Sequence, residues 1–299
     1  MTVVVTGARG QVGRCLVALG GDGLGRGDLD LSAAGTAGFR RAADEVFAHG
    51  NAPDVMINTA AWTDVDGAED VTNRRTVEAV NTTAPGELAR AARRAGARFI
   101  HVSTDYVFSG GAPDGGRGWR PDDPVHPANE YGRTKAEGEQ AVLAAGGTVV
   151  RTSWVWSGPD APGRDFVSVM ATLAHNGVDP RVVDDQVGRP TYAADLAGEL
   201  WALAEGLADP SGTSRPALLH LSNSGDPVSW CGLAREVFRF TGHDPARVTA
   251  CTTRDWPTPA ARPPWSVLDL ERWSAATGRT PPDWRDSLRR GLGDAFRLG

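Results

Sequence analysis

Short apolar runs, separated by segments with helical spacing, organise the first half of the chain. They occupy residues 2–6 (TVVVT), 54–60 (DVMINTA), 98–104 (RFIHVST) and 148–154 (TVVRTSW). Apolar residues that follow one another without alternation are typical of strands buried on both faces. Helical patterns lie between the runs, as in residues 86–96. This alternation predicts an α/β fold, a Rossmann-type doubly wound parallel sheet.

The second half of the chain has a different pattern. Six of the ten tryptophans lie after residue 196, and prolines interrupt residues 251–285. We therefore expect a Rossmann domain over residues 1–155 and a smaller α+β substrate domain over the remainder, residues 156–299. Three later segments are expected to return to the first domain, the last of them as another strand: residues 166–178, 190–207 and 218–223.

Composition narrows the possible functions. The 299 residues carry a net charge of -6 and are 40% hydrophobic, which favours a globular protein and disfavours binding to nucleic acid. No apolar run reaches the length of a membrane span, and the N-terminus lacks the features of a signal peptide, so we expect a cytoplasmic protein without membrane contact. The cysteines and histidines show no metal-ligand spacing, and we expect no metal site. The sequence leaves open whether the protein is a monomer or a homodimer.

A glycine-rich loop directly follows the first expected strand. Glycines at such a turn let backbone N–H groups approach a pyrophosphate at the positive end of the next helix. The alternative is an ordinary strand-to-helix turn, because three glycines alone are a weak signal. The position at the start of a β-α-β pattern favours dinucleotide binding. The expected contacts are Gly7, Arg9, Gly10, Gln11, Val12 and Gly13.

The choice between NAD and NADP depends on residues near the end of the second strand. An acid there accepts hydrogen bonds from the ribose of NAD, whereas a cation binds the extra phosphate of NADP. Residues 21–31 (GDGLGRGDLDL) offer Arg26 as well as Asp28 and Asp30, and Arg9 lies in the glycine loop. The two arginines favour NADPH, with NADH also possible. Arg26, Asp30 and Leu31 are expected to contact the cofactor.

Lys135 is the only lysine in a chain with 31 lysines and arginines. Tyr131 lies four residues earlier, among residues that favour a helix, so the two side chains share one helix face. For an arbitrary Tyr-x-x-x-Lys, a solvated lysine and a packed tyrosine are the more common explanation. A lone lysine among arginines, however, indicates a task that a forked guanidinium cannot perform. We therefore predict that Tyr131 and Lys135 are catalytic.

Further blocks of sequence support an enzyme of this kind. They are residues 58–69 (NTAAWTDVDGAE), 101–110 (HVSTDYVFSG), 127–139 (PANEYGRTKAEGE), 151–158 (RTSWVWSG), 183–197 (VDDQVGRPTYAADLA) and 262–269 (RPPWSVLD). Together with the glycine loop, and over nearly the whole chain, they resemble the dTDP-4-dehydrorhamnose reductase family of extended short-chain dehydrogenases/reductases. The segment between Gly13 and Asp30 is shorter than this family usually has. The adenosine-ribose contacts are expected from this segment, so their placement is the part of the resemblance that this departure concerns.

The resemblance implies a reaction, the NADPH-dependent reduction of the C4 ketone of a dTDP-4-keto-6-deoxy-L-hexose. Tyr131 would be the general acid. Lys135 would lower the tyrosine pKa from its usual value of about 10 and hold the nicotinamide ribose. Thr104, at the end of an expected strand, is placed to hydrogen-bond the ketone oxygen. The alternative for Thr104 is a Ser-Thr pair that caps a loop.

The resemblance also implies which residues bind the two ligands. Those expected beside the nicotinamide, diphosphate and ribose are Asn81, Ser103, Ala60, Ala61 and Thr63. Those expected in the sugar pocket are Asp105, Tyr106 and Trp154. The last three residues also fit structural roles, the aspartate as a turn former and the aromatics as core residues.

Two other functions remain on the same scaffold. Sugar-nucleotide dehydratases and epimerases oxidise and then reduce their substrate, and in the dehydratases the catalytic threonine precedes an Asp-Glu pair. Here Thr104 precedes Asp105 and Tyr106, so the glutamate is missing and net reduction is favoured. A regulatory subunit without catalytic activity is the other alternative, although Thr104, Tyr131 and Lys135 argue against it.

Overall fold

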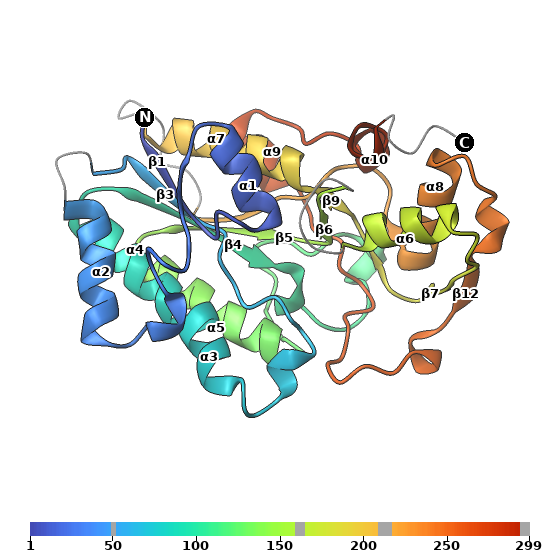
Figure 1. Cartoon of the computed structure of the whole chain (residues 1–299), viewed down its shortest axis with the longest axis horizontal. Coiled ribbons are helices and arrows are strands. Elements are labelled where there is room, and N and C mark those ends of the chain that lie inside the picture. The colour runs from blue at the N-terminus through green and yellow to red at the C-terminus, as the bar shows by residue number, and fades with distance from the viewer. Residues whose placement is uncertain (49–51, 159–164, 209–216, 294–299) are drawn as a thin grey trace.

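A parallel sheet of six strands forms the centre of the molecule (Figure 1). The computed structural model describes residues 1–48, 52–158, 165–208 and 217–293. The strands lie in the order β10-β5-β4-β3-β1-β2, and every neighbouring pair is parallel. Their bounds are β1 Val3–Thr6, β2 Asp22–Leu24, β3 Val55–Asn58, β4 Arg98–Thr104, β5 Thr148–Thr152 and β10 Leu218–His220. The uninterrupted apolar runs thus form strands as expected, and residues 218–220 do join the sheet.

The strand order creates a crevice above β1 and β3. From β1 the chain moves outward to β2, at one edge of the sheet, and then returns to β3 on the other side of β1. Ligands of doubly wound sheets bind at such a switch point, outside the carboxyl ends of the strands. Strand β2 has only three residues, because the chain turns away within a glycine-rich segment.

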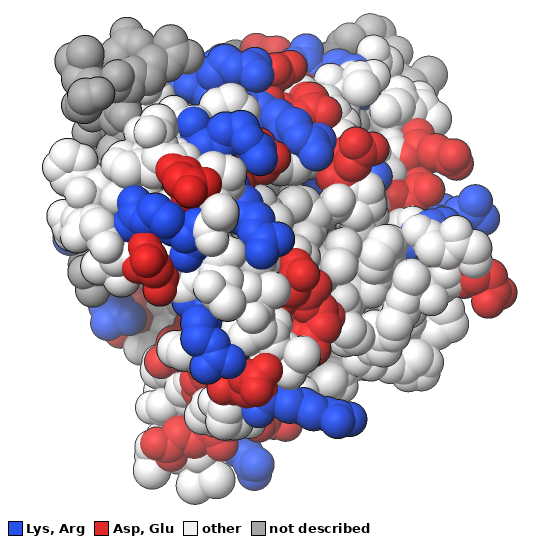
Figure 2. Space-filling model, turned by 90° about the vertical axis from the view of Figure 1, so that its right-hand side faces the viewer, with Lys and Arg blue, Asp and Glu red and all other residues white. Residues whose placement is uncertain are grey.

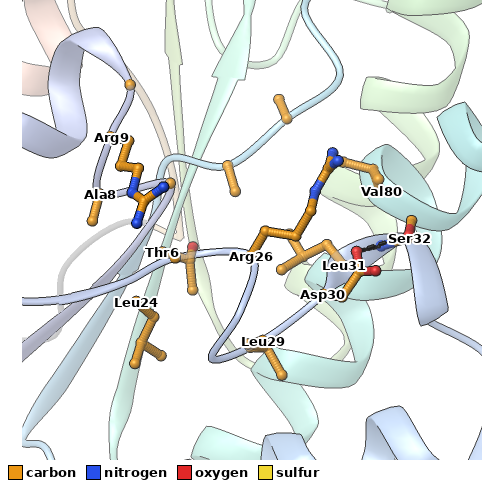
Figure 3. A pocket seen from close by; sticks show the side chains of 15 residues that line it. Thr6, Ala8, Arg9, Leu24, Arg26, Leu29, Asp30, Leu31, Ser32 and Val80 are labelled. Carbon is orange, nitrogen blue, oxygen red and sulfur yellow. Dashed lines mark hydrogen bonds between the residues drawn. The ribbon is translucent and has the colours of Figure 1, made fainter.

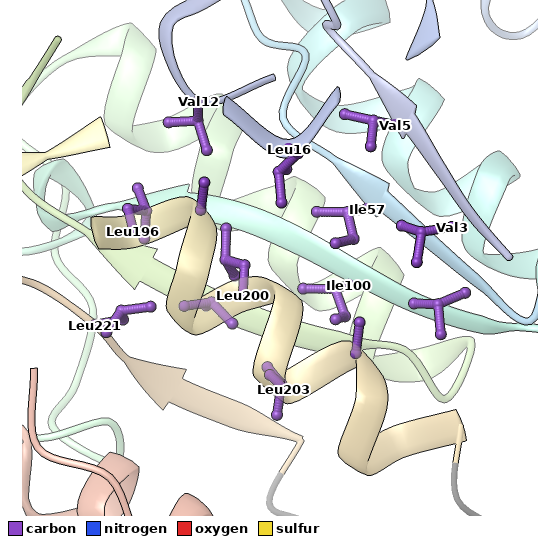
Figure 4. Close-up of a cluster of buried hydrophobic side chains, with 14 of the residues drawn as sticks. Val3, Val5, Val12, Leu16, Ile57, Ile100, Leu196, Leu200, Leu203 and Leu221 are labelled. Carbon is purple, nitrogen blue, oxygen red and sulfur yellow. The ribbon is translucent and has the colours of Figure 1, made fainter. Parts of the chain in front are cut away.

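Helices cover both faces of the sheet (Figure 1). Helices α1 (Gln11–Ala18) and α7 (Ala193–Ala208) pack on one face, where Val3 and Val5 point (Figure 4). Helices α2 (Ala37–Ala48), α4 (Ala84–Arg94) and α5 (Glu130–Ala144) pack on the other, where Val4 points. Successive strand side chains alternate between the two faces, which explains why the run at Val3–Thr6 is buried throughout. Shorter elements here are α3 (Arg74–Glu78), a π-helix (Ala79–Thr83) and α9 (Glu271–Thr277).

A second lobe has its own buried apolar cluster. It contains α6 (Phe166–His175), α8 (Trp230–Phe240) and α10 (Trp284–Leu292). Short strands pair two by two around it: β6 Val155–Trp156 with β9 Thr191–Tyr192, β7 Arg181–Val183 with β12 Thr249–Cys251, and β8 Val187–Gly188 with β11 Val228–Ser229. The expected return of residues 166–178 to the sheet domain is wrong. Helix α6 packs against α8, because Val167, Met170, Ala171 and Ala174 fit that cluster.

Charges are interleaved on the face of the second lobe that Figure 2 shows. Arginines of this lobe pair with nearby carboxylates, as Arg239 does with Glu236 in α8 and Arg289 with Asp286 in α10. Such pairs leave little net positive charge for a polyanion. Among the described residues, no helix combines the length and the apolar character that crossing a membrane requires.

Candidate active site

The glycine loop between β1 and α1 packs closely against the loop that follows β3. Gly7 has a φ of 71°, and a Cβ added there would lie 2.7 Å from the backbone nitrogen of Ala60. A Cβ on Gly13 would lie 2.1 Å from the carbonyl oxygen of Gly7. The first and third glycines therefore permit the turn and the close approach of helix and strand. Gly7 and Gly10 line two neighbouring pockets, whereas Gly13 lies in α1 and lines neither.

The first pocket, called the arginine pocket below, lies between the glycine loop and the residues after β2 (Figure 3). Asp30 accepts hydrogen bonds from the hydroxyl and the backbone N–H of Ser32, at 2.7 and 3.0 Å, and these bonds lower the pKa of its carboxyl. Neither Arg9 nor Arg26 has an ion-pair partner in the described part of the chain. Unpaired guanidinium groups beside an anion-binding loop fit a phosphate group. The predicted cofactor residues that line this pocket are Gly7, Arg9, Gly10, Arg26, Asp30, Leu31, Ala60 and Ala61.

The second pocket, called the tyrosine pocket, lies beyond the glycine loop at the carboxyl ends of β4 and β5. It brings together all three predicted catalytic residues, Thr104, Tyr131 and Lys135. The predicted binding residues in its lining are Gly7, Gly10, Gln11, Val12, Ala60, Ala61, Thr63, Ser103, Asp105, Tyr106 and Trp154. Residues from five separate parts of the sequence thus converge on one cavity. The two pockets share the glycine loop and the loop after β3, so one extended dinucleotide fits across both.

Helix α5 presents Tyr131 and Lys135 to the pocket because glycines let it approach the segment after β4 and the π-helix closely. A Cβ on Gly132 would lie 2.2 Å from the carbonyl oxygen of Tyr106, and one on Gly138 would lie 2.1 Å from that of Asn81. The helix begins after Asn129, whose side chain accepts a hydrogen bond from the Gly132 N–H at 2.8 Å. Both glycines are therefore needed for close packing of the helix and not for backbone flexibility.

Burial, not the lysine charge, dominates the electrostatics of Tyr131. Loss of solvent raises its pKa to about 12, and the hydrogen bond with Thr104 opposes this rise only in part. The Lys135 amine contacts the carbonyl oxygen of Val102 at 2.8 Å and Nε2 of His101 at 3.1 Å. The expected lowering of the tyrosine pKa by Lys135 is therefore not found. Tyr131 is a protonated phenol, which is the form that a general acid requires.

Lys135 is itself strongly perturbed. Its side chain is only 1% exposed, and burial lowers its pKa to about 8, against a smaller raising effect of Glu139. Glu139 is committed to a buried ion pair with Arg151, at 2.7 Å. The one lysine of the chain thus lies where an amine titrates much closer to neutrality than it does in water.

Buried polar groups gather at the carboxyl ends of β4 and β5. Thr104 donates to Asp105 at 3.1 Å and accepts from the Tyr106 N–H at 3.2 Å. Burial raises the pKa of Asp105 to about 6. The Ser103 hydroxyl, the Thr152 hydroxyl and one oxygen of Asp105 are buried and find no hydrogen-bond partner within the described parts of the chain. Such atoms in a pocket wall are available to a ligand.

A stack of aromatic residues forms the wall on the side of the second lobe. Trp154 and Trp230 are parallel, with centroids 3.6 Å apart and an angle of 9° between their planes. Trp154 has a φ of 49°, rare for a residue with a side chain, and a Cβ on Gly188 would lie 2.6 Å from its indole. The indole therefore lies between Gly188 and Trp230. Sequence reasoning missed Trp230, whose only local signal is its position at the start of α8.

Asn81 does not line either pocket, contrary to the expectation of a direct contact beside the nicotinamide. Its buried side chain accepts from the Trp62 N–H at 2.9 Å and donates to the Trp62 carbonyl at 3.2 Å. Asn81 therefore braces the loop that carries Ala60, Ala61 and Thr63. Among the described residues, no group of three or more metal-binding side chains gathers.

Comparison with known proteins identifies the family of the chain. Residues 1–296 match the family described as the RmlD substrate binding domain. The chain belongs to this family. The resemblance drawn from the motifs is thereby confirmed, together with the Rossmann-type fold and the assignment to the oxidoreductases.

Three proteins similar to this chain are reductases by name. The dTDP-4-dehydrorhamnose reductase of Mycobacterium tuberculosis is 47% identical, over 97% of this chain and 92% of the relative. A probable dTDP-4,6-dihydroxy-2-methyloxan-3-one 4-ketoreductase of Streptomyces antibioticus is 38% identical, over 98% of this chain and 95% of the relative. The crystal structure of dTDP-4-dehydrorhamnose reductase from Bacillus anthracis in complex with NADP has a TM-score of 0.84 and 28% identity, and covers 98% of this chain and 99% of that one.

Proposed function

We propose that the protein uses NADPH to reduce the C4 ketone of a dTDP-linked 4-keto-6-deoxy-L-hexose. The observation that carries this proposal is the convergence of Thr104, Tyr131 and Lys135 on one pocket that also contains the glycine loop. The relatives named above are two dTDP-4-dehydrorhamnose reductases, one of them solved with NADP, and a probable dTDP-4,6-dihydroxy-2-methyloxan-3-one 4-ketoreductase. The product would be dTDP-L-rhamnose or a related dTDP-deoxysugar.

The site fits a nicotinamide dinucleotide on three structural grounds. The glycine loop approaches the backbone of Ala60 so closely that no side chain fits between them. The arginine pocket contains Arg9 and Arg26, neither of which has an ion-pair partner among the described residues, and an arginine near this point is what accommodates an adenosine 2'-phosphate. In the tyrosine pocket, the buried hydroxyls of Ser103 and Thr152 have no hydrogen-bond partner among the residues that the structure describes. NADH would use the same site without the 2'-phosphate contact.

The residues of the tyrosine pocket have separate roles in the reduction of the ketone. The bound nicotinamide supplies the hydride to the ketone carbon. Tyr131, held protonated by burial, donates its proton to the oxygen that gains negative charge. The Thr104 hydroxyl hydrogen-bonds the same oxygen and orients the carbonyl. Lys135 binds the nicotinamide ribose, and Asp105, Tyr106 and Trp154 hold the sugar.

The enzyme assay separates this function from its alternatives. Purified protein is mixed with NADPH and a dTDP-4-keto-6-deoxy-L-hexose, and NADPH fluorescence and the sugar product are followed together. We expect one NADPH oxidised per alcohol formed. A sugar product without net NADPH consumption would support an epimerase or dehydratase. Tight NADPH binding without turnover, on a panel of keto-sugar nucleotides, would support a regulatory subunit.

A further inference from the structure

A chain of buried hydrogen bonds connects the catalytic lysine to the loop after β3. Lys135 Nζ lies 3.1 Å from His101 Nε2, and His101 Nδ1 lies 3.0 Å from the side-chain nitrogen of Asn58. The Asn58 side-chain oxygen accepts from the Ala60 N–H at 3.2 Å and from the Thr6 hydroxyl at 2.6 Å. His101 and Asn58 are fully buried. The chain runs beneath the carboxyl ends of β1, β3 and β4, outside the roles assigned so far.

Donor and acceptor rules fix the position of every proton along this series of hydrogen bonds. A backbone N–H only donates, so the side-chain oxygen of Asn58 must face Ala60, and its NH₂ group must face His101. His101 Nδ1 then accepts, and a neutral imidazole that accepts at Nδ1 carries its proton on Nε2. That proton points at Lys135 Nζ. Lys135 already donates to the Val102 carbonyl at 2.8 Å.

An ammonium group cannot accept a hydrogen bond, because it has no lone pair. The uncharged amine can accept from His101 and still donate to Val102. A doubly protonated His101 is excluded at neutral pH, because burial and the nearby Lys135 hold the pKa of this imidazole far below its usual value. Only the pair of neutral imidazole and neutral amine satisfies every contact, so this arrangement belongs to the state above the Lys135 pKa of about 8.

We propose that His101 is a positioning residue for Lys135: its Nε2–H donates to the lysine amine and favours the uncharged form of that amine. A protonated Lys135 must turn away from His101, toward the pocket where the ribose hydroxyls are expected. Asn58 determines which ring nitrogen of His101 carries the proton. The backbone N–H of Ala60, a residue that lines both pockets, determines the orientation of the Asn58 side chain. The catalytic consequence rests on the proposed function, whereas the protonation of Lys135 does not.

Other ionisable groups around Lys135 do not replace His101 in this role. Glu139, one turn further along α5, favours the charged amine and is paired with Arg151 of β5. Tyr131, on the same helix, and Asp105, after β4, line the pocket with Lys135. A carboxylate or phenolate near the amine favours its charged form. Among the groups that face Lys135, His101 is thus the one that opposes protonation by a directed bond.

The composition of the chain makes a direct test possible. Protein labelled with ¹³C at the lysine ε-carbon gives a single lysine resonance, because Lys135 is the only lysine. Its titration by NMR, without ligands, is expected near pH 8 in the wild type. His101→Met removes the donor but keeps an apolar side chain of similar size, and should move the midpoint up by about one pH unit or more. The matched control is His220→Met, because His220 is equally buried but contacts Trp119 and Arg151 instead.

Two results would overturn the proposal: a wild-type midpoint above pH 10, or a His101→Met midpoint equal to that of the wild type. The wild-type measurement stands even if His101→Met fails to fold. The pH profile of kcat/KM gives a second readout, since its high-pH limb should shift with the NMR midpoint in His101→Met and stay in place in His220→Met. Absence of turnover in the wild type would contradict the proposed function and leave the NMR result unaffected.

Discussion

The Thr104 hydroxyl donates its only proton to the carboxyl group of the next residue, Asp105, at 3.1 Å. A threonine in this arrangement cannot donate to a substrate carbonyl until its hydroxyl rotates. The Thr104 hydroxyl oxygen also accepts a hydrogen bond from the backbone N–H of Tyr106, at 3.2 Å. Substrate binding therefore has to compete with Asp105 for the proton of Thr104, and the charge of Asp105 influences the outcome.

Asp105→Asn tests the energetic effect of this buried carboxyl group. The folded state raises its pKa to about 6, so the native protein binds more protons than the unfolded chain between about pH 4 and pH 6. The contribution of Asp105 to stability thus falls as the pH rises through this window and stays unfavourable above it. We expect Asp105→Asn to be more stable than the wild type by about 3 kcal/mol at pH 7. The advantage should shrink toward pH 4 in urea unfolding curves, and an advantage that grows toward low pH would contradict the assignment.

Tyr131→Phe tests proton delivery. The substitution keeps the ring and its edge-to-face contact with Tyr106, whose centroid lies 5.5 Å away, so folding and NADPH binding should be retained. We expect the single-turnover rate of NADPH oxidation to fall about 10²-fold or more, because the general acid is lost. Titration calorimetry checks cofactor binding. Tyr106→Phe is the comparison and should affect KM for the sugar more than the rate of reduction, whereas an unchanged rate in Tyr131→Phe would assign the proton to another donor.

The two arginines of the arginine pocket test the cofactor preference. If Arg9 or Arg26 binds the 2'-phosphate, its replacement by Ala removes a charge-assisted bond of about 1.5 to 3 kcal/mol from NADPH only. KM for NADPH should rise roughly tenfold or more, with little change for NADH. Arg14→Ala is the matched control, because Arg14 is an exposed residue of α1 outside both pockets. Equal losses for both cofactors would contradict a 2'-phosphate contact.

Local patterns predict the sheet and the site, because both follow from strand ends. Uninterrupted apolar runs mark buried strands, and in a parallel sheet their carboxyl ends meet at one edge, which brings Thr104 near the glycine loop. Trp230 could not be predicted in the same way, because its position depends on how the second lobe folds back. The direction of the Tyr131 pKa shift could not be predicted from the sequence either. Burial makes this shift upward, and burial depends on how the helix and the loops pack.

Lys135→Met separates stability from activity at the centre of the site. The pKa of Lys135 lies near 8 in the folded state and near 10.5 otherwise, so the unfolded chain binds more protons between these values. The lysine therefore destabilises the fold below about pH 8, and this effect disappears as the pH rises toward 10.5. We expect Lys135→Met to gain about 3 kcal/mol of stability at pH 7, a gain that declines above pH 8, and to lose turnover. Lys135→Arg should lose both stability and turnover, because a buried guanidinium keeps the charge and cannot accept the hydrogen bond from His101. Urea unfolding at pH 7 and at pH 10, alongside single-turnover rates, distinguishes these outcomes; a Lys135→Met variant less stable than the wild type at pH 7 would show that the buried amine carries no such penalty.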